Sequence, residues 1–298
     1  MGHFFHYPYS DKLIQSTLDF WEPKYAERGE QLTRADAEEI LRNLGGFFDT
    51  LWKMDQAQRK RTIENYYREK GVEVAGSLAD DLKTDNFKAL QHVEYAINHL
   101  AGVPGLDEFL RDLAQITKTD NDGERIYHNN LTQLHAIGFV HKTLGCQIFE
   151  VESKSHPVLA PRRVGKKSCD IHALRDSTDL YFECKDASSE TLSQHQWKGA
   201  THYTPMGEEE IRAWIEQESR AANRKGADYL ICRVPVWVSG WEEEEQEFYD
   251  KWIRKVFEVK AQPGKSEVTI TRPQKLSKQF QGIYIIKTFG YLKLMFPD

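Results

Sequence analysis

The chain is poor in cysteine, and the cysteines that it has are scattered. Cys146, Cys169, Cys184 and Cys232 form no C-x-x-C pair. This spacing fits a reducing compartment and is not typical of a disulfide-stabilised fold or a zinc ribbon. None of the 11 histidines lies in an H-E-x-x-H motif, which argues against a zinc hydrolase.

Long apolar runs and targeting segments are also missing. No stretch reaches the roughly 20 apolar residues that a membrane-spanning helix needs. The N-terminal MGHFFHYPYS lacks the basic start and the apolar core of a secretory signal, and His6 stands where a myristoylation signal has Ser or Thr. We therefore expect a cytoplasmic protein without a membrane segment.

The overall charge carries no sign of nucleic-acid binding. A hydrophobic content of 40% with 29% charged residues is typical of a globular protein that buries a core. The formal net charge is −6, so any surface for a polyanion must be local.

The first 117 residues predict a series of helices. Ser10 is a candidate N-cap for the first helix, which we expect to end before Pro23, and Thr33 is a candidate N-cap for the second. Gly45 and Gly46 predict a kink or break in the second helix. The apolar spacing predicts helices over residues 10–21, 33–44, 57–70, 86–100 and 106–117. Aromatic stripes at helical spacing usually belong to a core, so a helical bundle is favoured here over a recognition module.

The polar, turn-rich segment Lys118–Gly123 is the best candidate for a domain boundary. We therefore predict a helical region over residues 1–120 and a second domain over residues 121–298. In the second domain we expect helices over 124–144, 208–225 and 241–259 and strands over 147–152, 229–238, 268–271 and 282–295. The last two strands should extend a sheet or form an edge hairpin, and the polar stretch 188–205 should be a loop.

Two short alternating segments, Ser168–Leu174 and Asp179–Lys185, predict a β-hairpin closed by a polar turn. Side chains alternate between the faces of a strand, so Glu183 and Lys185 share one face of the second strand and Cys184 lies on the other. In the first strand Asp170 and His172 share a face. If the strands pair, Asp170, Glu183 and Lys185 converge, and two carboxylates beside an ammonium group suit a divalent cation and an anionic substrate. The alternative is a surface hairpin whose charges form cross-strand ion pairs.

The pattern Asp170, then Glu183-Cys184-Lys185, resembles the motif of the PD-(D/E)xK nuclease superfamily. Cys169 stands at the motif's proline position. The predicted order of helix, three strands, helix and strand over residues 124–239 also resembles this family. The resemblance implies an α/β fold, a mixed central sheet flanked by helices as in restriction endonucleases, preceded here by an all-helical N-terminal region.

The resemblance also implies a function. It implies a metal-dependent nuclease that hydrolyses phosphodiester bonds, with DNA as the favoured substrate and Mg²⁺ or Mn²⁺ as the cofactor. Asp170, Glu183 and the carbonyl group of Cys184 would hold the metal, and Asp170, Glu183 and Lys185 would be the catalytic residues. Some enzymes that cut both strands act as dimers, so a homo-oligomer is left open.

One position departs from the family's pattern. The first helix of the family commonly supplies a further acidic ligand, and the equivalent position here is Gln133, with His135 nearby. A glutamine can support a metal through its carbonyl oxygen but brings no charge. Two alternatives to a nuclease therefore stay open: a catalytically inactive protein of this fold that binds nucleic acid or a protein partner, and an interaction protein in which the hairpin is incidental.

A basic segment leads directly into the hairpin. Residues 153–168 contain no acidic residue and five basic ones, Lys154, Arg162, Arg163, Lys166 and Lys167. Such a cluster suits a phosphate backbone, because each neutralised phosphate releases counterions. The alternative is a solvated charged loop, which is what most charge runs are.

Overall fold

The computed structural model describes residues 9–84, 86–117, 121–151, 169–187, 192–197, 200–205, 208–233, 256–257, 266–286 and 291–296. Contacts divide the chain into two units, Met1–Arg61 and Thr62–Asp298. The second unit holds the sheet and begins at Thr62, so it includes helices that the sequence assigned to a separate N-terminal region.

The first unit contains helix α1 (Asp11–Ala26) and most of α2 (Arg34–Glu69). Ser10 caps α1, as predicted, because its Oγ accepts the Leu13 N–H at 3.2 Å. The expected end of this helix was wrong. Pro23 lies inside α1, and the helix continues for another turn because the Pro23 carbonyl still accepts the N–H of Glu27 at 3.1 Å.

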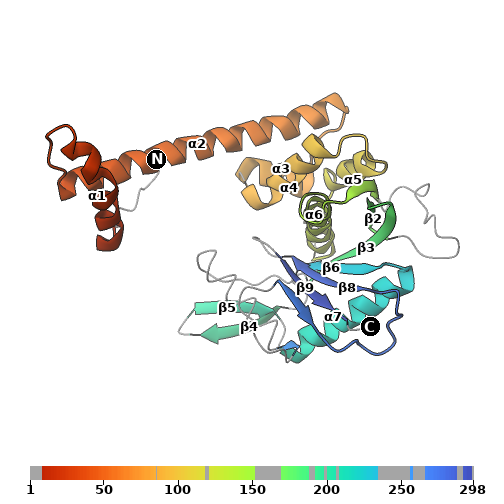
Figure 1. The fold of residues 1–298 in the computed structure, drawn as a ribbon. Helices are drawn as coiled ribbons and strands as arrows, with labels where there is room; N and C mark the ends of the chain where they lie inside the picture. The colour runs from red at the N-terminus through yellow and green to blue at the C-terminus, as the bar shows by residue number, and fades with distance from the viewer. Residues whose placement is uncertain are drawn as a thin grey trace. The chain divides into compact units, whose positions relative to one another are not determined.

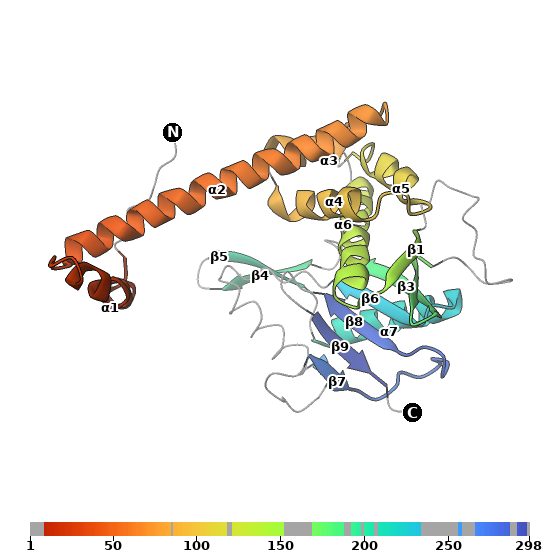
Figure 2. The same cartoon turned by 45° about the horizontal axis from the view of Figure 1, so that its top comes forward.

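Helix α2 is one continuous helix, so the predicted break at Gly45-Gly46 was also wrong (Figure 2). Its start was predicted correctly: the Thr33 hydroxyl oxygen accepts the Asp36 N–H at 3.3 Å, and the Asp36 carboxylate accepts the Thr33 N–H at 2.8 Å, which together cap the helix. A glycine costs a helix about 1 kcal/mol relative to alanine, which weakens α2 at this point without forbidding helical geometry.

The second unit combines helices with a mixed seven-stranded sheet, in the order β1-β2-β3-β6-β8-β9-β7. Its helices are α3 (Gly76–Thr84), α4 (Phe87–His99), α5 (Leu106–Leu113), α6 (Asn121–Lys142) and α7 (Glu208–Lys225). The strands of the sheet are β1 (Gln147–Val151), β2 (Ile171–Arg175), β3 (Thr178–Asp186), β6 (Tyr229–Arg233), β7 (Glu267–Thr269), β8 (Gly282–Ile286) and β9 (Tyr291–Met295).

Strands β1, β2 and β3 form an antiparallel meander, and β6 joins it parallel to β3 after α7. The mixed α/β class is therefore confirmed. The polar stretch 188–205, expected to be a loop, instead contains β4 (Leu192–Trp197) and β5 (Ala200–Pro205), which form a separate two-stranded sheet. The sequences of these strands are mostly polar and lack the regular apolar alternation by which a strand is recognised.

The C-terminal strands extend the main sheet, as predicted, but the segment 282–295 is not one strand. It forms β8 and β9, which pair antiparallel with Gly282 opposite Met295. All residues of β8 are buried, whereas those of β9 alternate, because β8 is central and β9 lies next to the edge strand β7. The predicted helix over 241–259 lies almost wholly outside the described residues.

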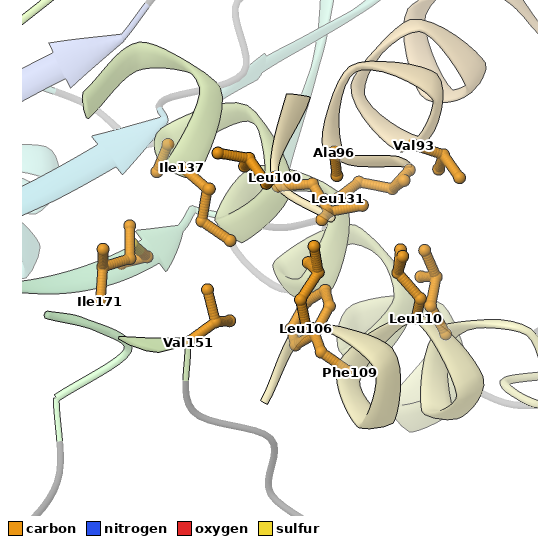
Figure 3. Packing of buried hydrophobic residues seen from close by; sticks show 14 of the residues in the cluster. Val93, Ala96, Leu100, Leu106, Phe109, Leu110, Leu131, Ile137, Val151 and Ile171 are labelled. Atoms are coloured by element: carbon orange, nitrogen blue, oxygen red, sulfur yellow. The ribbon is translucent and has the colours of Figure 1, made fainter. Parts of the chain in front are cut away.

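Helices α6 and α7 lie on opposite sides of the sheet (Figure 1). Leu180 and Phe182 of β3 belong to the core that α6 shares with α4 and α5. Figure 3 shows part of this core, with Val93, Leu106 and Leu131 from the three helices. On the opposite face of the sheet, Leu230 and Cys232 of β6 belong to the core that also contains Ile211 and Ile215 of α7. One face of the sheet is thus covered by α6 and the other by α7.

No described helix is long and apolar enough to cross a membrane.

Two histidines pack between α4 and α6. The rings of His92 and His135 are stacked with their centroids 4.3 Å apart. Burial, with added repulsion from Arg233, lowers the pKa of His135 to about 4, and burial with the neighbouring His135 lowers the pKa of His92. Both rings are therefore neutral in the folded protein at neutral pH.

This pair makes the fold acid-sensitive. The unfolded chain takes up a proton at each histidine near pH 6.5, whereas folded His135 does so only near pH 4. The stability that it contributes is thus fully present above pH 6.5 and is lost as the pH falls toward 4. We expect His135→Phe, which keeps a stacked ring, to remove about 1–3 kcal/mol of the stability difference between pH 7 and pH 4.5, measured by urea unfolding. An unchanged difference would contradict this prediction.

Candidate active site

The predicted hairpin is present, and its register aligns the candidate residues. Ile171 pairs with Phe182 and Arg175 with Thr178, leaving a two-residue turn, Asp176-Ser177. Both turn residues have positive φ, 49° and 62°, as in the type I′ turn that matches the twist of paired strands. Extending this register by one residue puts Asp170 opposite Glu183.

The faces of β3 divide as the alternation predicted. Phe182 and Cys184 lie in the core shared with α6, so Glu183 and Lys185 face α7. One detail differs from the expected pattern. Cys169 packs on the α7 side, where its Sγ lies 3.8 Å from the Lys225 carbonyl oxygen, because it precedes β2 and does not follow the pleat.

Glu183 is the centre of the site. Its side chain is 0% exposed, and its Oε1 accepts hydrogen bonds from the Lys185 ammonium group at 2.8 Å and from the Lys225 ammonium group. Its other oxygen, Oε2, is buried and has no hydrogen-bond partner in the described part of the chain. A buried, unpaired carboxylate oxygen is costly, so it marks a position where a cation or a donor is expected.

Asp170 is held beside Glu183 by the backbone. Its Oδ2 accepts the Cys184 N–H at 2.6 Å, and its carbonyl oxygen accepts the amide of Gln133 at 3.3 Å. The structure therefore brings together four residues singled out from the sequence, Asp170, Glu183, Lys185 and Gln133. Gln133 is buried and contacts the backbone of Asp170.

Lys225 belongs to the same cluster and was missed by the sequence analysis. It is the last residue of α7, where the helix dipole favours a cation, and it reaches Glu183 across 42 residues of chain. Its only sequence signal is a basic residue at the end of a helix that connects two strands. Many helices end in this way, so the signal alone selects no site.

Burial and charge shift the pKa values of this cluster. Burial, with the neighbouring Asp170 carboxylate, raises the pKa of Glu183 to about 7 against the opposing effect of Lys185 and Lys225. Burial lowers the pKa of Lys185 and of Lys225, but the carboxylates of Glu183 and Asp170 outweigh it, so both pKa values are raised. Both lysines thus stay charged at neutral pH, and Glu183 is poised to exchange a proton for another cation.

The residues fit a magnesium ion. Mg²⁺ in proteins is commonly held by one or two carboxylates and keeps several waters or substrate oxygens. Asp170 and Glu183 supply two adjacent carboxylates, and the unpartnered Glu183 Oε2 offers a buried ligand. Among the residues that the structure describes, no set of three His, Cys, Asp or Glu side chains is arranged around one metal position.

A second group of polar side chains lies along the same face of the hairpin. His172 Nε2 lies 2.7 Å from Asp179 Oδ1, and its Nδ1 lies 3.9 Å from Glu150 Oε2. Its ring stacks on Tyr181 with centroids 4.5 Å apart. This packing fixes the imidazole, and it confirms that His172 lies in β2 across from β3 residue Tyr181.

The basic segment predicted to bind phosphate lies outside the described residues. This applies to Lys154, Arg162, Arg163, Lys166 and Lys167, whose role stays a prediction. Comparison of the chain with protein-family models, with curated proteins and with solved structures finds no match in any of the three.

Proposed function

We propose that this protein is a metal-dependent nuclease of the PD-(D/E)xK type. The observation that carries the proposal is the convergence of Asp170, Glu183 and Lys185 from two adjacent strands around the buried Glu183 carboxylate. The strand order β1-β2-β3-β6, with β3 and β6 parallel and α6 and α7 on opposite faces, supports the restriction-endonuclease-like fold that this type requires.

Asp170 and Glu183, with the carbonyl group of Cys184, would hold Mg²⁺ or Mn²⁺. A bound Mg²⁺ supplies an acidified water and polarises the phosphoryl oxygen. In hydrolysis the water oxygen would bond to phosphorus and its proton would pass to solvent, while the bond to the sugar oxygen would break and that oxygen would take up a proton from solvent. Lys185, charged and next to Glu183, would donate a hydrogen bond to the attacking water or to the phosphoryl oxygen as its charge grows.

The direct test is an incubation of the full chain with linear, circular and single-stranded DNA and with RNA. We expect cleavage with Mg²⁺ or Mn²⁺ and none with EDTA. DNA is the favoured substrate, and cleavage of RNA alone would redirect the proposal to a ribonuclease. No cleavage of any substrate with either metal would reject it.

A second function is favoured by one specific observation. Two ammonium groups, those of Lys185 and Lys225, already contact one oxygen of Glu183, and Gln133 stands where a further acid is expected. A site neutralised in this way suits a protein that binds nucleic acid or a protein partner without cutting. Salt-dependent binding of DNA without cleavage would support this second function.

The basic segment gives a separate prediction about affinity. We expect neutralisation of Arg162, Arg163, Lys166 and Lys167 to glutamine to weaken DNA binding. Each lost phosphate contact lowers the slope of log K against log salt by about 1. The measurement is a salt titration of the apparent Kd by fluorescence anisotropy.

A matched control neutralises four exposed basic residues elsewhere, namely Lys12, Arg28, Lys83 and Lys278. The net charge then changes by the same amount, and the affinity should change much less. Equal losses in the two variants would mean that only the overall charge matters, and the segment would be ordinary solvated surface.

A further inference from the structure

A stretch of α2 lies in the first unit without the packing that a helix of this kind needs. Every residue from 42 to 55 is exposed except Asp49. The stretch contains Gly45 and Gly46, and a Cβ added to either would meet no atom within 4 Å beyond the backbone of its own helix and its chain neighbours. Glycine weakens a helix, and tertiary packing does not support this stretch of α2, so we expect burial against a partner to stabilise it.

The exposed stretch is amphipathic. We define the α2 stripe by its members, Leu44, Phe47, Phe48, Leu51 and Met54, which are between 40% and 64% exposed. Leu44, Phe47, Leu51 and Met54 repeat with the 3-4-3 spacing of a helix–helix seam. Trp52, which is 48% exposed, flanks the stripe beside Phe48, and the stripe ends before Asp55, which pairs with Arg59. The opposite side carries Arg42, Asp49 and Lys53, so the apolar side chains are concentrated on one face.

The size of the stripe matches an interface. Large apolar side chains present about 150–250 Å² each when fully exposed, so the stripe offers on the order of 500 Å². Two copies would bury on the order of 1,000 Å², which reaches the lower limit for a specific interface. A second copy of the chain presents a helix with the same seam and is therefore a suitable partner.

We propose that the α2 stripe is a homodimerisation surface, in which two copies of the chain pair through their α2 helices in antiparallel orientation. The midpoint of the stripe lies near Asp49, so antiparallel pairing aligns the turn of one copy that carries Glu38 and Glu39 with the turn of the other that carries Lys60 and Arg61. These charges lie outside the seam and act at longer range. The charges of the two ends are complementary in this orientation, and the two helix dipoles oppose each other. The proposal does not depend on the nuclease function.

The first test measures the mass of the full chain in solution by light scattering and sedimentation in the micromolar range. The wild type is expected at twice the mass of one chain. The double variant Phe47→Glu/Phe48→Glu should have the mass of one chain, because two charges cannot be buried in an apolar seam. A monomeric wild type, or a double variant that stays dimeric, would overturn the proposal.

The matched control is Phe20→Glu, since Phe20 is 64% exposed but lies on α1, outside the stripe. It should remain dimeric, and its loss of the dimer would mean that the stripe is not the specific interface. Circular dichroism on each variant separates dissociation from unfolding of the second unit.

A cross-linking test addresses orientation and does not rely on a destabilising change. Asn43→Cys and Ala57→Cys replace two exposed side chains on α2 that flank the seam and face each other when the stripes pair antiparallel about Asp49. Mixed and mildly oxidised, the two variants should form a disulfide-linked heterodimer in a several-fold excess over the linked homodimers that either forms alone. Linked homodimers in each separate variant, with no excess in the mixture, would overturn the antiparallel arrangement.

Discussion

The substitution Glu183→Gln is expected to lower Mg²⁺-dependent cleavage by about 1,000-fold or more. It keeps the size of the side chain but removes the buried charge at the centre of the site. The single remaining carboxylate, Asp170, holds a hard dication poorly, and the loss of the metal removes the acidified water. Asp170→Asn should have a comparable effect, because it removes the charge of the second proposed carboxylate ligand, which the Cys184 N–H holds in place.

The measurements are the cleavage rate on plasmid DNA and the Mg²⁺ or Mn²⁺ affinity by calorimetry. Asp176→Asn is the matched control, since this carboxylate lies in the turn of the same hairpin with a side chain 94% exposed. Asparagine also tolerates the left-handed conformation of this residue. We expect the control to cleave as the wild type does, and a Glu183→Gln variant that retains more than about 10% of the rate would refute the assignment.

The second expected result separates the two lysines that contact Glu183. Lys185→Met should lower the cleavage rate by roughly 100-fold or more without weakening metal binding, because a donor to the developing negative charge is lost. Lys225→Met removes a second cation that pairs with the same carboxylate oxygen. Loss of either cation should favour metal binding, but Lys225→Met should reduce the rate less than Lys185→Met does.

Single-turnover rates and metal titrations on both variants check this prediction. The side chains of Lys185 and Lys225 are 31% and 29% exposed, so burial alone does not distinguish them. A larger loss of rate in Lys225→Met than in Lys185→Met would transfer the catalytic role to the end of α7. Lys225→Arg is the comparison for Lys225→Met, since it keeps the positive charge but replaces the compact ammonium group.

Local sequence determined the elements whose signals are self-contained. The bounds of α7, 208–225, were predicted to the residue, because an amphipathic helix followed by Gly226 in a left-handed conformation has a defined end. The hairpin was predicted because alternation over Leu180, Phe182 and Cys184 reports which face is buried. The same alternation determined that Glu183 and Lys185 would share a face.

Other local signals were overridden by context. Pro23 and Gly45-Gly46 are helix-breaking residues, yet α1 and α2 continue through them. A cost of about 1 kcal/mol per glycine is small beside the cooperative backbone hydrogen bonding of the 36-residue α2. Proline in the last turn of α1 interrupts few remaining hydrogen bonds. Boundaries that depend on a single residue are therefore the weakest part of the sequence analysis.

What the sequence by itself determined is the hairpin and the side of each strand on which its charged residues lie, because a period of two is a property of the local backbone. Only the tertiary structure decided that Lys225 contacts Glu183, that one Glu183 oxygen is left unpartnered, and that Asp170 binds the Cys184 N–H. These contacts join residues that are between 14 and 42 positions apart. The Asp170 contact follows from the register of the β2–β3 hairpin. The Lys225 contact depends on how α7 crosses the sheet between β3 and β6, and no local pattern encodes that crossing.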